Sequence, residues 1–133
     1  MRPRTVAVVV LATSTFGSRL SAQATSTASA IGTWRGTSLC TVRPSSCNDE
    51  HVVYRVTPLS ARDSVSFDAR KVVNGREEEM GVLRCTPAAS RAQITCTMPN
   101  GVWRFEVRGD SLVGELRLPN DTRFRDVRTA RSR

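Results

Sequence analysis

A cluster of polar residues suited to chemistry, Asn48-Asp49-Glu50-His51, directly follows the second cysteine. An imidazole next to two carboxylates could bind a metal ion or act as an acid–base pair. One histidine and two neighbouring carboxylates are too few ligands to specify a metal, so the pattern favours a solvated loop that leads into a strand. We expect no metal site, and we keep Asp49, Glu50 and His51 as candidates for contact with a small ligand.

The sequence contains no motif that would activate a nucleophile for covalent catalysis. His51 is the only histidine, so any serine or threonine nucleophile would depend on it as general base. The Gly-x-Ser-x-Gly turn of hydrolases and the glycine-rich loop that holds phosphate are both missing. We therefore predict neither an enzymatic activity nor a bound cofactor.

The first 24 residues have the layout of a secretory signal. Residues 1–5 are basic, residues 6–12 (VAVVVLA) are apolar, and Ala22-Gln23-Ala24 is the small-residue pattern that precedes a cleavage site. We expect cleavage after Ala24, with Ala30 as the alternative, and a secreted or periplasmic protein. The apolar run is far shorter than the ~20 residues that cross a bilayer, so we expect no membrane span.

Cleavage after Ala24 would leave one domain, residues 25–133, which holds all four cysteines. An even number of cysteines in an exported domain indicates two disulfides. The cysteine positions favour Cys40–Cys47 and Cys85–Cys96, and the two other connectivities stay open. Gaps of six and ten residues within these pairs differ from the Cys-x-x-Cys spacing of zinc sites.

The basic charge of the chain does not indicate a nucleic-acid partner. Loss of the signal removes Arg2, Arg4 and Arg19 and no acidic residue, so the net charge falls from +8 to +5. The remaining arginines are scattered singly along alternating segments, and few aromatic residues are present for base stacking. We therefore interpret the charge as that of a solvated surface.

From Gly32 onward, short segments alternate apolar with polar residues, and turn residues separate them. This pattern is typical of antiparallel strands joined by hairpins. Eight strands in a small domain leave two reactive edges unless the sheet closes. The prediction is an all-β, eight-stranded antiparallel up-and-down meander barrel, ordered from about residue 31 to 130. Its expected strands are 32–42, 51–58, 64–73, 77–86, 93–98, 101–108, 111–118 and 123–130.

Two hairpins can be placed in register, and each then collects its apolar residues on one face. The first uses Gly109-Asp110 as a two-residue turn. The expected pairs are Trp103–Leu116, Phe105–Gly114 and Val107–Leu112 in the first hairpin, and Leu83–Met98 and Cys85–Cys96 in the second. A slip of one residue would turn each of these side chains to the other face.

The residues Ile31-Gly32-Thr33-Trp34 resemble the Gly-x-Trp opening of the lipocalins, which avidin-like and other calycin barrels share in looser form. The chain is thus similar to small secreted bacterial barrels of the calycin type. In that superfamily the tryptophan plugs one end of the barrel, and an arginine of the last strand lies across its ring. The resemblance implies that Gly32 and Trp34 form the plug together with an arginine from residues 123–130.

The register of the last hairpin decides which arginine that is. If residues 120–122 form a three-residue loop, Phe124, Asp126 and Arg128 face inward, and Arg128 covers Trp34 by stacking and cation–π contact. A one-residue change in the loop would substitute Arg125. An inward Asp126 would need a partner, for which Arg128 is the candidate.

In a meander, the loops after the first, third, fifth and seventh strands share the end opposite the plug. Small-molecule sites tend to lie in such barrel mouths. Asn74 and Asn100 lie in these loops, and Asp126 is expected to face inward from the last strand. These three residues join Asp49, Glu50 and His51 as candidate ligand contacts. The predicted function is binding of a small apolar ligand at the mouth. The alternative is a protein-interaction or inhibitor module of the cell envelope, which would use the disulfide-held loop 40–51 and hold no ligand in the barrel.

Overall fold

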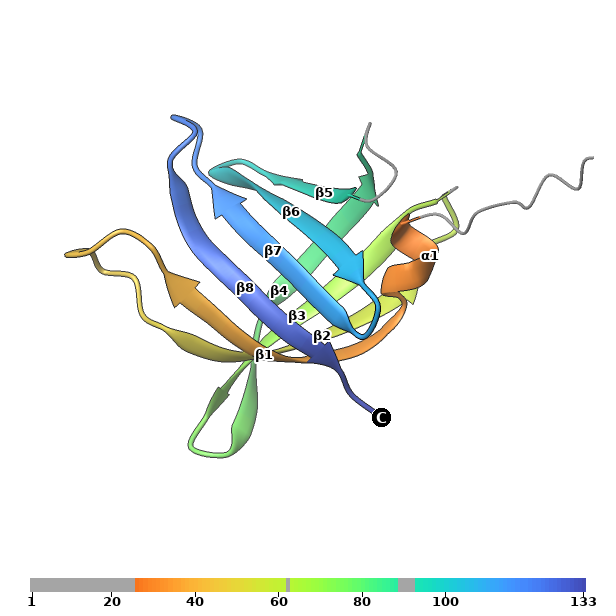
Figure 1. Ribbon diagram of the computed structural model, residues 1–133, viewed down its shortest axis with the longest axis horizontal. Helices are drawn as coiled ribbons and strands as arrows, with labels where there is room; N and C mark the ends of the chain where they lie inside the picture. The colour runs from red at the N-terminus through yellow and green to blue at the C-terminus, as the bar shows by residue number, and fades with distance from the viewer. Residues whose placement is uncertain (1–25, 62, 89–92) are drawn as a thin grey trace, which may run out of the picture.

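The strands follow the alternation of the sequence and close on themselves. The computed structural model describes residues 26–61, 63–88 and 93–133. Each strand pairs antiparallel with the next, and the last pairs with the first, which closes a barrel in meander order (Figure 1). The elements are α1 (Ser26–Ala30), β1 (Gly32–Cys40), β2 (Glu50–Pro58), β3 (Val65–Val73), β4 (Arg76–Pro87), β5 (Gln93–Met98), β6 (Gly101–Arg108), β7 (Ser111–Arg117) and β8 (Arg123–Arg131).

The β6–β7 register expected from the sequence is confirmed, and Thr86–Thr95 and Pro87–Ile94 continue the register expected for Cys85 and Cys96. The expected pair Leu83–Met98 is corrected, because β4 turns away from β5 before Leu83 and the ladder between them ends at Thr86. The β6–β7 ladder pairs Trp103 with Leu116 and Phe105 with Gly114, and a methyl group at position 114 would collide with the Phe105 ring. Both expected disulfides, Cys40–Cys47 and Cys85–Cys96, are present. The second is buried and joins β4 to β5 next to the few residues at which these strands pair.

The closed half of the barrel is filled by aromatic rings. Tyr54, Phe67 and Phe105 are buried against one another, with ring centroids 4.8 to 6.2 Å apart. Trp34 lies below them with no exposed surface, and its Nε1 donates a hydrogen bond to the Ala30 carbonyl at 2.7 Å. Trp34 is thus buried at the end of the barrel next to α1, a position compatible with the plug that the Gly-x-Trp resemblance implies.

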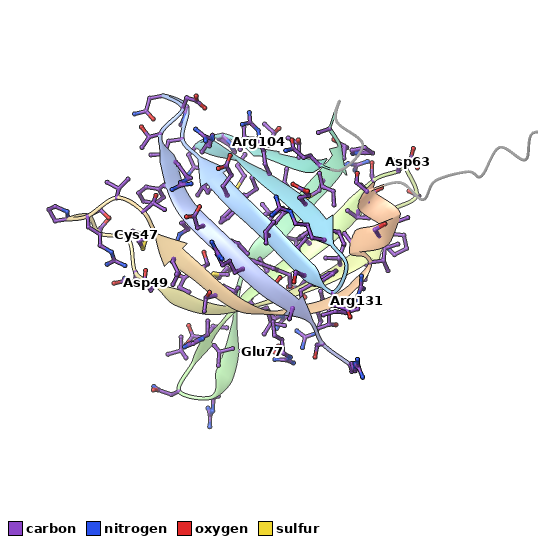
Figure 2. All side chains as sticks on the ribbon, viewed as in Figure 1. Cys47, Asp49, Asp63, Glu77, Arg104 and Arg131 are labelled. Atoms are coloured by element: carbon purple, nitrogen blue, oxygen red, sulfur yellow. A yellow bond between two sulfur atoms is a disulfide. The ribbon has the colours of Figure 1, made fainter. Side chains whose placement is uncertain are left out.

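The arginine across Trp34 is Arg131, so the expectation of Arg128 is corrected. The Arg131 guanidinium carbon lies 4.2 Å from the Trp34 ring centroid. Its two terminal nitrogens donate hydrogen bonds to the carbonyls of Ile31 and Ser29, each at 2.9 Å. Figure 2 shows Arg131 at the end of β8, beside the start of β1. This one side chain ties the last strand to the segment before the first.

A shift of one residue in the β7–β8 register explains the difference. The turn closes with a hydrogen bond from the Leu118 N–H to the Thr122 carbonyl, and a bulge follows at Leu116 and Arg117. Beyond the bulge, Leu116 pairs with Arg125, so the odd-numbered residues of β8 face inward. Phe124, Asp126 and Arg128 consequently lie on the outer face. Arg125 faces inward, as the alternative loop length implied, but it contacts Ser38 and Glu50 and does not cover Trp34.

The short helix α1 covers the closed end and lies outside the pattern that predicted the strands. It contacts β4, β5 and β6, and the Ser26 hydroxyl donates to the Gln93 carbonyl at 3.1 Å. Thr27 and Ala30 are almost completely buried. Five small residues carry no readable periodicity, which is why alternation did not detect them. The expected signal, residues 1–24, lies outside the described residues.

Two truncated chains test the contribution of α1. A chain that begins at Ile31 loses the buried residues of α1 and the Ala30 carbonyl that accepts from Trp34. We expect its free energy of unfolding to be lower by about 2 kcal/mol or more than that of a chain beginning at Thr25. Urea unfolding followed by tryptophan fluorescence measures the difference. Equal midpoints would show that α1 does not stabilise the barrel.

Substitution of Arg131 tests the stack on the plug. Arg131→Met keeps an apolar stem but removes the cation–π contact and two hydrogen bonds to carbonyls, so we expect a loss of about 2 kcal/mol in the free energy of unfolding. Arg128→Met, at an exposed position of the same strand, is the matched control and should change stability by less than about 0.5 kcal/mol. Thermal unfolding of both variants measures the two losses of stability. Equal losses would contradict the assignment of Arg131 as the residue that covers Trp34.

Candidate functional site

The barrel wall is least complete between β4 and β5. β4 pairs with β3 along most of its length, whereas β5 pairs with β4 only at Thr86 and Pro87. A bulge leaves Met80 without a partner on β3, and Gly81 adopts a φ of 148°, which residues with a side chain rarely do. The β3–β4 hairpin therefore turns away from the β5–β6 hairpin, as Figure 1 shows.

A pocket with a volume of about 220 Å³ opens into the barrel at this place. Met80 and Leu83 of β4 form one wall, and Met98 of β5 with Trp103 of β6 forms the other. The Trp103 ring stacks on Phe105 with 5.6 Å between centroids, and this contact fixes its plane against the filled core. Most of the pocket surface is thus apolar, and two flexible methionine side chains can adapt to what enters.

The inner end of the pocket is polar and carries one charge of each sign. Arg125 Nη1 lies 3.2 Å from the Ser38 hydroxyl and 3.5 Å from a Glu50 carboxylate oxygen. The Arg125 side chain is only 13% exposed and that of Glu50 21%, so water screens this pair less than it screens the surface pairs. The two charges cancel, and the polar end is neutral as a whole.

Tyr54 adds a protonated hydroxyl beside this pair. Its side chain lines the pocket and is buried. Burial is the main cause that raises the pKa of Tyr54 above its usual value, and the negative charge of Glu50 raises it further. A hydrogen bond with Ser38 acts in the opposite direction. The hydroxyl therefore stays uncharged at physiological pH and can donate or accept a hydrogen bond.

Of the residues expected at the mouth, only Glu50 lines this pocket. Its neighbours point elsewhere, because alternate residues of a strand face opposite sides. His51 is exposed on the outer face, and Asp49 accepts hydrogen bonds from the Cys40 N–H at 2.8 Å and from Arg43 at 2.6 Å. The three adjacent residues thus have three separate surroundings and do not form a joint site.

The other expected contacts also lie away from the pocket. Asn74 and Asn100 are exposed in the turns after β3 and β5. Asp126 lies on the outer face of β8, and its carboxylate is 3.5 Å from Arg123. Within residues 26–61, 63–88 and 93–133, no group of three or more histidine, cysteine, aspartate or glutamate side chains could hold a metal ion. The described part of the chain also contains no helix that is long and apolar enough to cross a bilayer.

Sequence reasoning missed most of the pocket. Met80 and Met98 belong to no motif, and for Trp103 the sequence predicts only a cross-strand pair with Leu116. Arg125 was named only as the substitute for Arg128 in a shifted register. The alternation of side chains along β8 could have identified Arg125. Any register in which the apolar Val127 faces inward also turns Arg125 inward, because the two residues are two positions apart.

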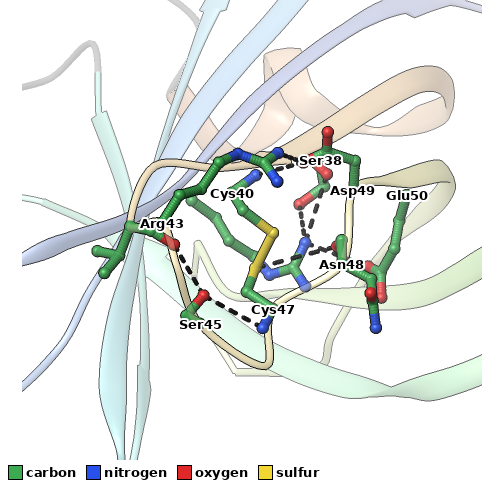
Figure 3. Close-up of polar contacts among 10 residues, drawn as sticks. Ser38, Cys40, Arg43, Ser45, Cys47, Asn48, Asp49 and Glu50 are labelled. Atoms are coloured by element: carbon green, nitrogen blue, oxygen red, sulfur yellow. Dashed lines mark hydrogen bonds and ion pairs between the residues drawn. A yellow bond between two sulfur atoms is a disulfide. The ribbon is translucent and has the colours of Figure 1, made fainter.

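The loop between β1 and β2 is held by several internal bonds, which Figure 3 shows together. The Cys40–Cys47 disulfide closes it, and Asp49 bridges its two sides through Cys40 and Arg43. The Ser45 hydroxyl donates to the Val42 carbonyl at 2.7 Å. This loop is exposed along most of its length, so its bonds hold a defined shape in contact with solvent.

Comparison with known proteins finds no family model that matches the chain and no significant match among the curated proteins. The closed eight-stranded meander and the Trp34 plug are consistent with a calycin-like fold. Because sequence similarity assigns no function, the geometry of the pocket has to carry the argument.

The Asp49 carboxyl should titrate below its usual range. The hydrogen bond from the Cys40 N–H is the main cause that lowers its pKa below 3.8, and the Arg43 charge adds to it. A lowered pKa in the folded state stabilises the loop fully above pH 3.8, and this stabilisation is lost as the pH falls through the lowered value. A carboxyl NMR titration measures the midpoint, which we expect below 3.8.

Arg43→Gln provides the control for this titration. Since the Cys40 N–H is the larger cause, the variant should raise the Asp49 pKa only part of the way to its ordinary value. A wild-type midpoint at or above 3.8 would show that the Asp49 bridge is not formed in solution.

Proposed function

We propose that this protein is an exported binding protein for a small, uncharged, amphipathic molecule, which it holds in the pocket beside β4 and β5. One observation carries the proposal: an apolar pocket ends on a neutral Arg125–Glu50 pair inside a barrel that is otherwise filled. The apolar part of the ligand would lie between the two methionines and Trp103. Its polar group would reach Arg125, Glu50 or the Tyr54 hydroxyl.

The volume of the pocket limits the size of the ligand. About 220 Å³ exceeds the ~150 Å³ cavity that holds benzene, and it is smaller than the ~300 Å³ at which sites for drug-sized molecules begin. A ligand with about ten non-hydrogen atoms, such as a medium-chain alcohol, therefore fits. The aromatic rings below Tyr54 prevent a long chain from passing through to the plug.

The charges at the inner end favour a neutral polar group. A carboxylate would gain from Arg125 but would meet Glu50, and an ammonium group would face the reverse problem. A hydroxyl, amide or ester group can instead accept a hydrogen bond from Arg125 without breaking the pair, and a hydroxyl or amide can also donate to Glu50. Buried polar groups discriminate strongly against ligands that leave them unpaired.

A titration with n-octanol, octanoate and octylamine tests the proposal. Two of the three methionines of the chain, Met80 and Met98, line the pocket, so ¹³C-methyl methionine NMR reports directly on it. We expect both methyl signals to shift, and n-octanol to bind at least about tenfold more tightly than either charged analogue. Tighter binding of a charged analogue would contradict the neutral polar end.

A pair of leucine substitutions on β3 provides the control. Ala69→Leu places a larger side chain into the pocket and should weaken n-octanol binding by about tenfold or more. Ser66→Leu adds the same side chain on the outer face of the same strand and should bind as the wild type does. If both variants fold and both still bind, the ligand lies elsewhere.

A protein-binding role for loop 40–51 is the second candidate, and the internal bonds of the loop favour it. A loop already held in one shape loses little conformational entropy when a partner binds. Capture of a cell-envelope protein that is lost in a Cys40→Ser/Cys47→Ser variant, but kept in Ala69→Leu, would assign partner binding to the loop. Equal capture by the loop variant and the wild type would rule the loop out.

A further inference from the structure

The free edge of β4 is a second surface with chemistry of its own. Residues 76–84 of β4 pair with β3 on one side and with no strand on the other, within the part of the chain that the structure describes, and β5 lies beside β4 from Cys85 onward. Such an edge presents unpaired N–H and C=O groups, which can form a ladder with another strand. The β3–β4 hairpin turns away from the barrel wall, so this edge lies where another molecule can approach (Figure 1).

Exposed apolar side chains lie on the same edge. Val82 is 60% exposed and Met80 41%, which places both among the exposed large hydrophobic residues of the described chain. Val82 points to the outer face, because Leu83 and Cys85 face the interior. An unpaired edge and an exposed apolar side chain at one place together indicate an interface rather than a solvated surface.

Opposite charges flank this apolar stretch. Glu77 is bound by Arg55 at 2.7 and 2.9 Å, and Glu78 lies 3.8 Å from Lys71. Glu79 and Arg84, by contrast, have no ion pair among the residues that the structure describes, and both are exposed. Along the edge, the acidic Glu79 is followed by the apolar stretch 80–83 and then by the basic Arg84. Both charged side chains can therefore form ion pairs with another molecule.

We propose that two copies of this protein associate by antiparallel pairing of their β4 edges around a two-fold axis at Val82. In a two-fold interface, each contact occurs twice with the roles exchanged. Val82 then meets Val82 of the partner subunit, and Leu83 lies opposite Gly81 of the partner subunit. Arg84 then lies opposite Met80 of the partner subunit, next in sequence to Glu79 of the partner subunit. The bulge against β3 puts Glu79 on the same outer face as Val82 and Arg84, so the two opposite charges are neighbours across the interface.

This charge pattern favours a second copy over an unrelated strand. An acidic residue on one side of the axis and a basic residue on the other make the edge complementary to itself only in the antiparallel direction. A parallel copy would place Glu79 against Glu79 and Arg84 against Arg84. The three glutamates and the bulge protect the outer part of the hairpin against indiscriminate pairing, and the stretch from Met80 to Leu83 is left for this contact.

The dimer goes beyond the proposed function. It shares Met80, Gly81 and Leu83 with the apolar wall of the pocket, but it does not use Arg125, Glu50 or Tyr54, and its test needs no ligand. Sedimentation velocity of the protein from about 5 to about 500 µM should show a rapid monomer–dimer equilibrium, since an edge contact is smaller than a standard interface. Glu79→Arg and Arg84→Glu should each weaken the dimer by about tenfold or more, because like charges then face each other.

Mixing the two single variants gives the decisive result. Glu79→Arg carries two positive charges at the edge and Arg84→Glu two negative ones, so an equimolar mixture should form a heterodimer where each variant alone stays monomeric. The double variant Glu79→Arg/Arg84→Glu should regain the wild-type dimer. Arg104→Glu, an equal charge change at an exposed residue of β6, is the matched control and should dimerise normally.

Three outcomes would overturn the proposal. These are a wild type that stays monomeric over the whole concentration range, single variants that dimerise as the wild type does, and a mixture that remains monomeric. The methionine methyl spectrum of each variant shows that its barrel is folded, so loss of the dimer cannot be confused with unfolding. n-Octanol binding measured in the monomeric variants keeps failure of this proposal separate from failure of the proposed function.

Discussion

The contact of Arg131 with Trp34 is the interaction on which the rest of the barrel depends. Trp34 needs an acceptor for its buried N–H and a cover for its ring, and Ala30 and Arg131 supply them. Arg131 also binds two carbonyls of the segment before β1, so the last strand is locked against the first at the closed end. Once that end is closed and filled, the opposite end can remain open.

The two ends therefore differ in how completely their backbone is paired. At the closed end, β4 and β5 pair and are joined by the buried Cys85–Cys96 disulfide. Toward the mouth, the bulge at Met80 and the φ of Gly81 turn β4 away. The same departure creates the pocket on the inner side of β4 and the free edge at its outer side. Both proposed sites thus have a single structural cause.

The sequence predicts much of the fold because two-residue periodicity and short turns constrain a meander strongly. Barrel closure and both disulfides are confirmed, and so is the β6–β7 register. The site was harder to predict, because the sequence does not show whether the odd- or the even-numbered residues of a strand face inward. A single bulge exchanges the two sets. The bulge at Leu116 and Arg117 turned Arg128 outward and Arg125 inward, and the bulge at Met80 brought a methionine to the pocket. Gly81 inside a strand pattern is the one sequence sign of the bulge at Met80, and the bulge at Leu116 and Arg117 has no such sign.

The shift of one residue on β8 also explains why two arginines of this strand make different contacts inside the barrel. Arg125 and Arg131 lie on the inner face of one strand, six residues apart, so they reach opposite ends of the barrel. Arg131 lies over an indole and serves the plug, whereas Arg125 is placed against Ser38 and Glu50 at the pocket. A buried cation requires compensation, and Glu50 supplies it on β2, across β1 from Arg125. This compensation makes the polar end neutral, and it is the physical reason to expect an uncharged ligand.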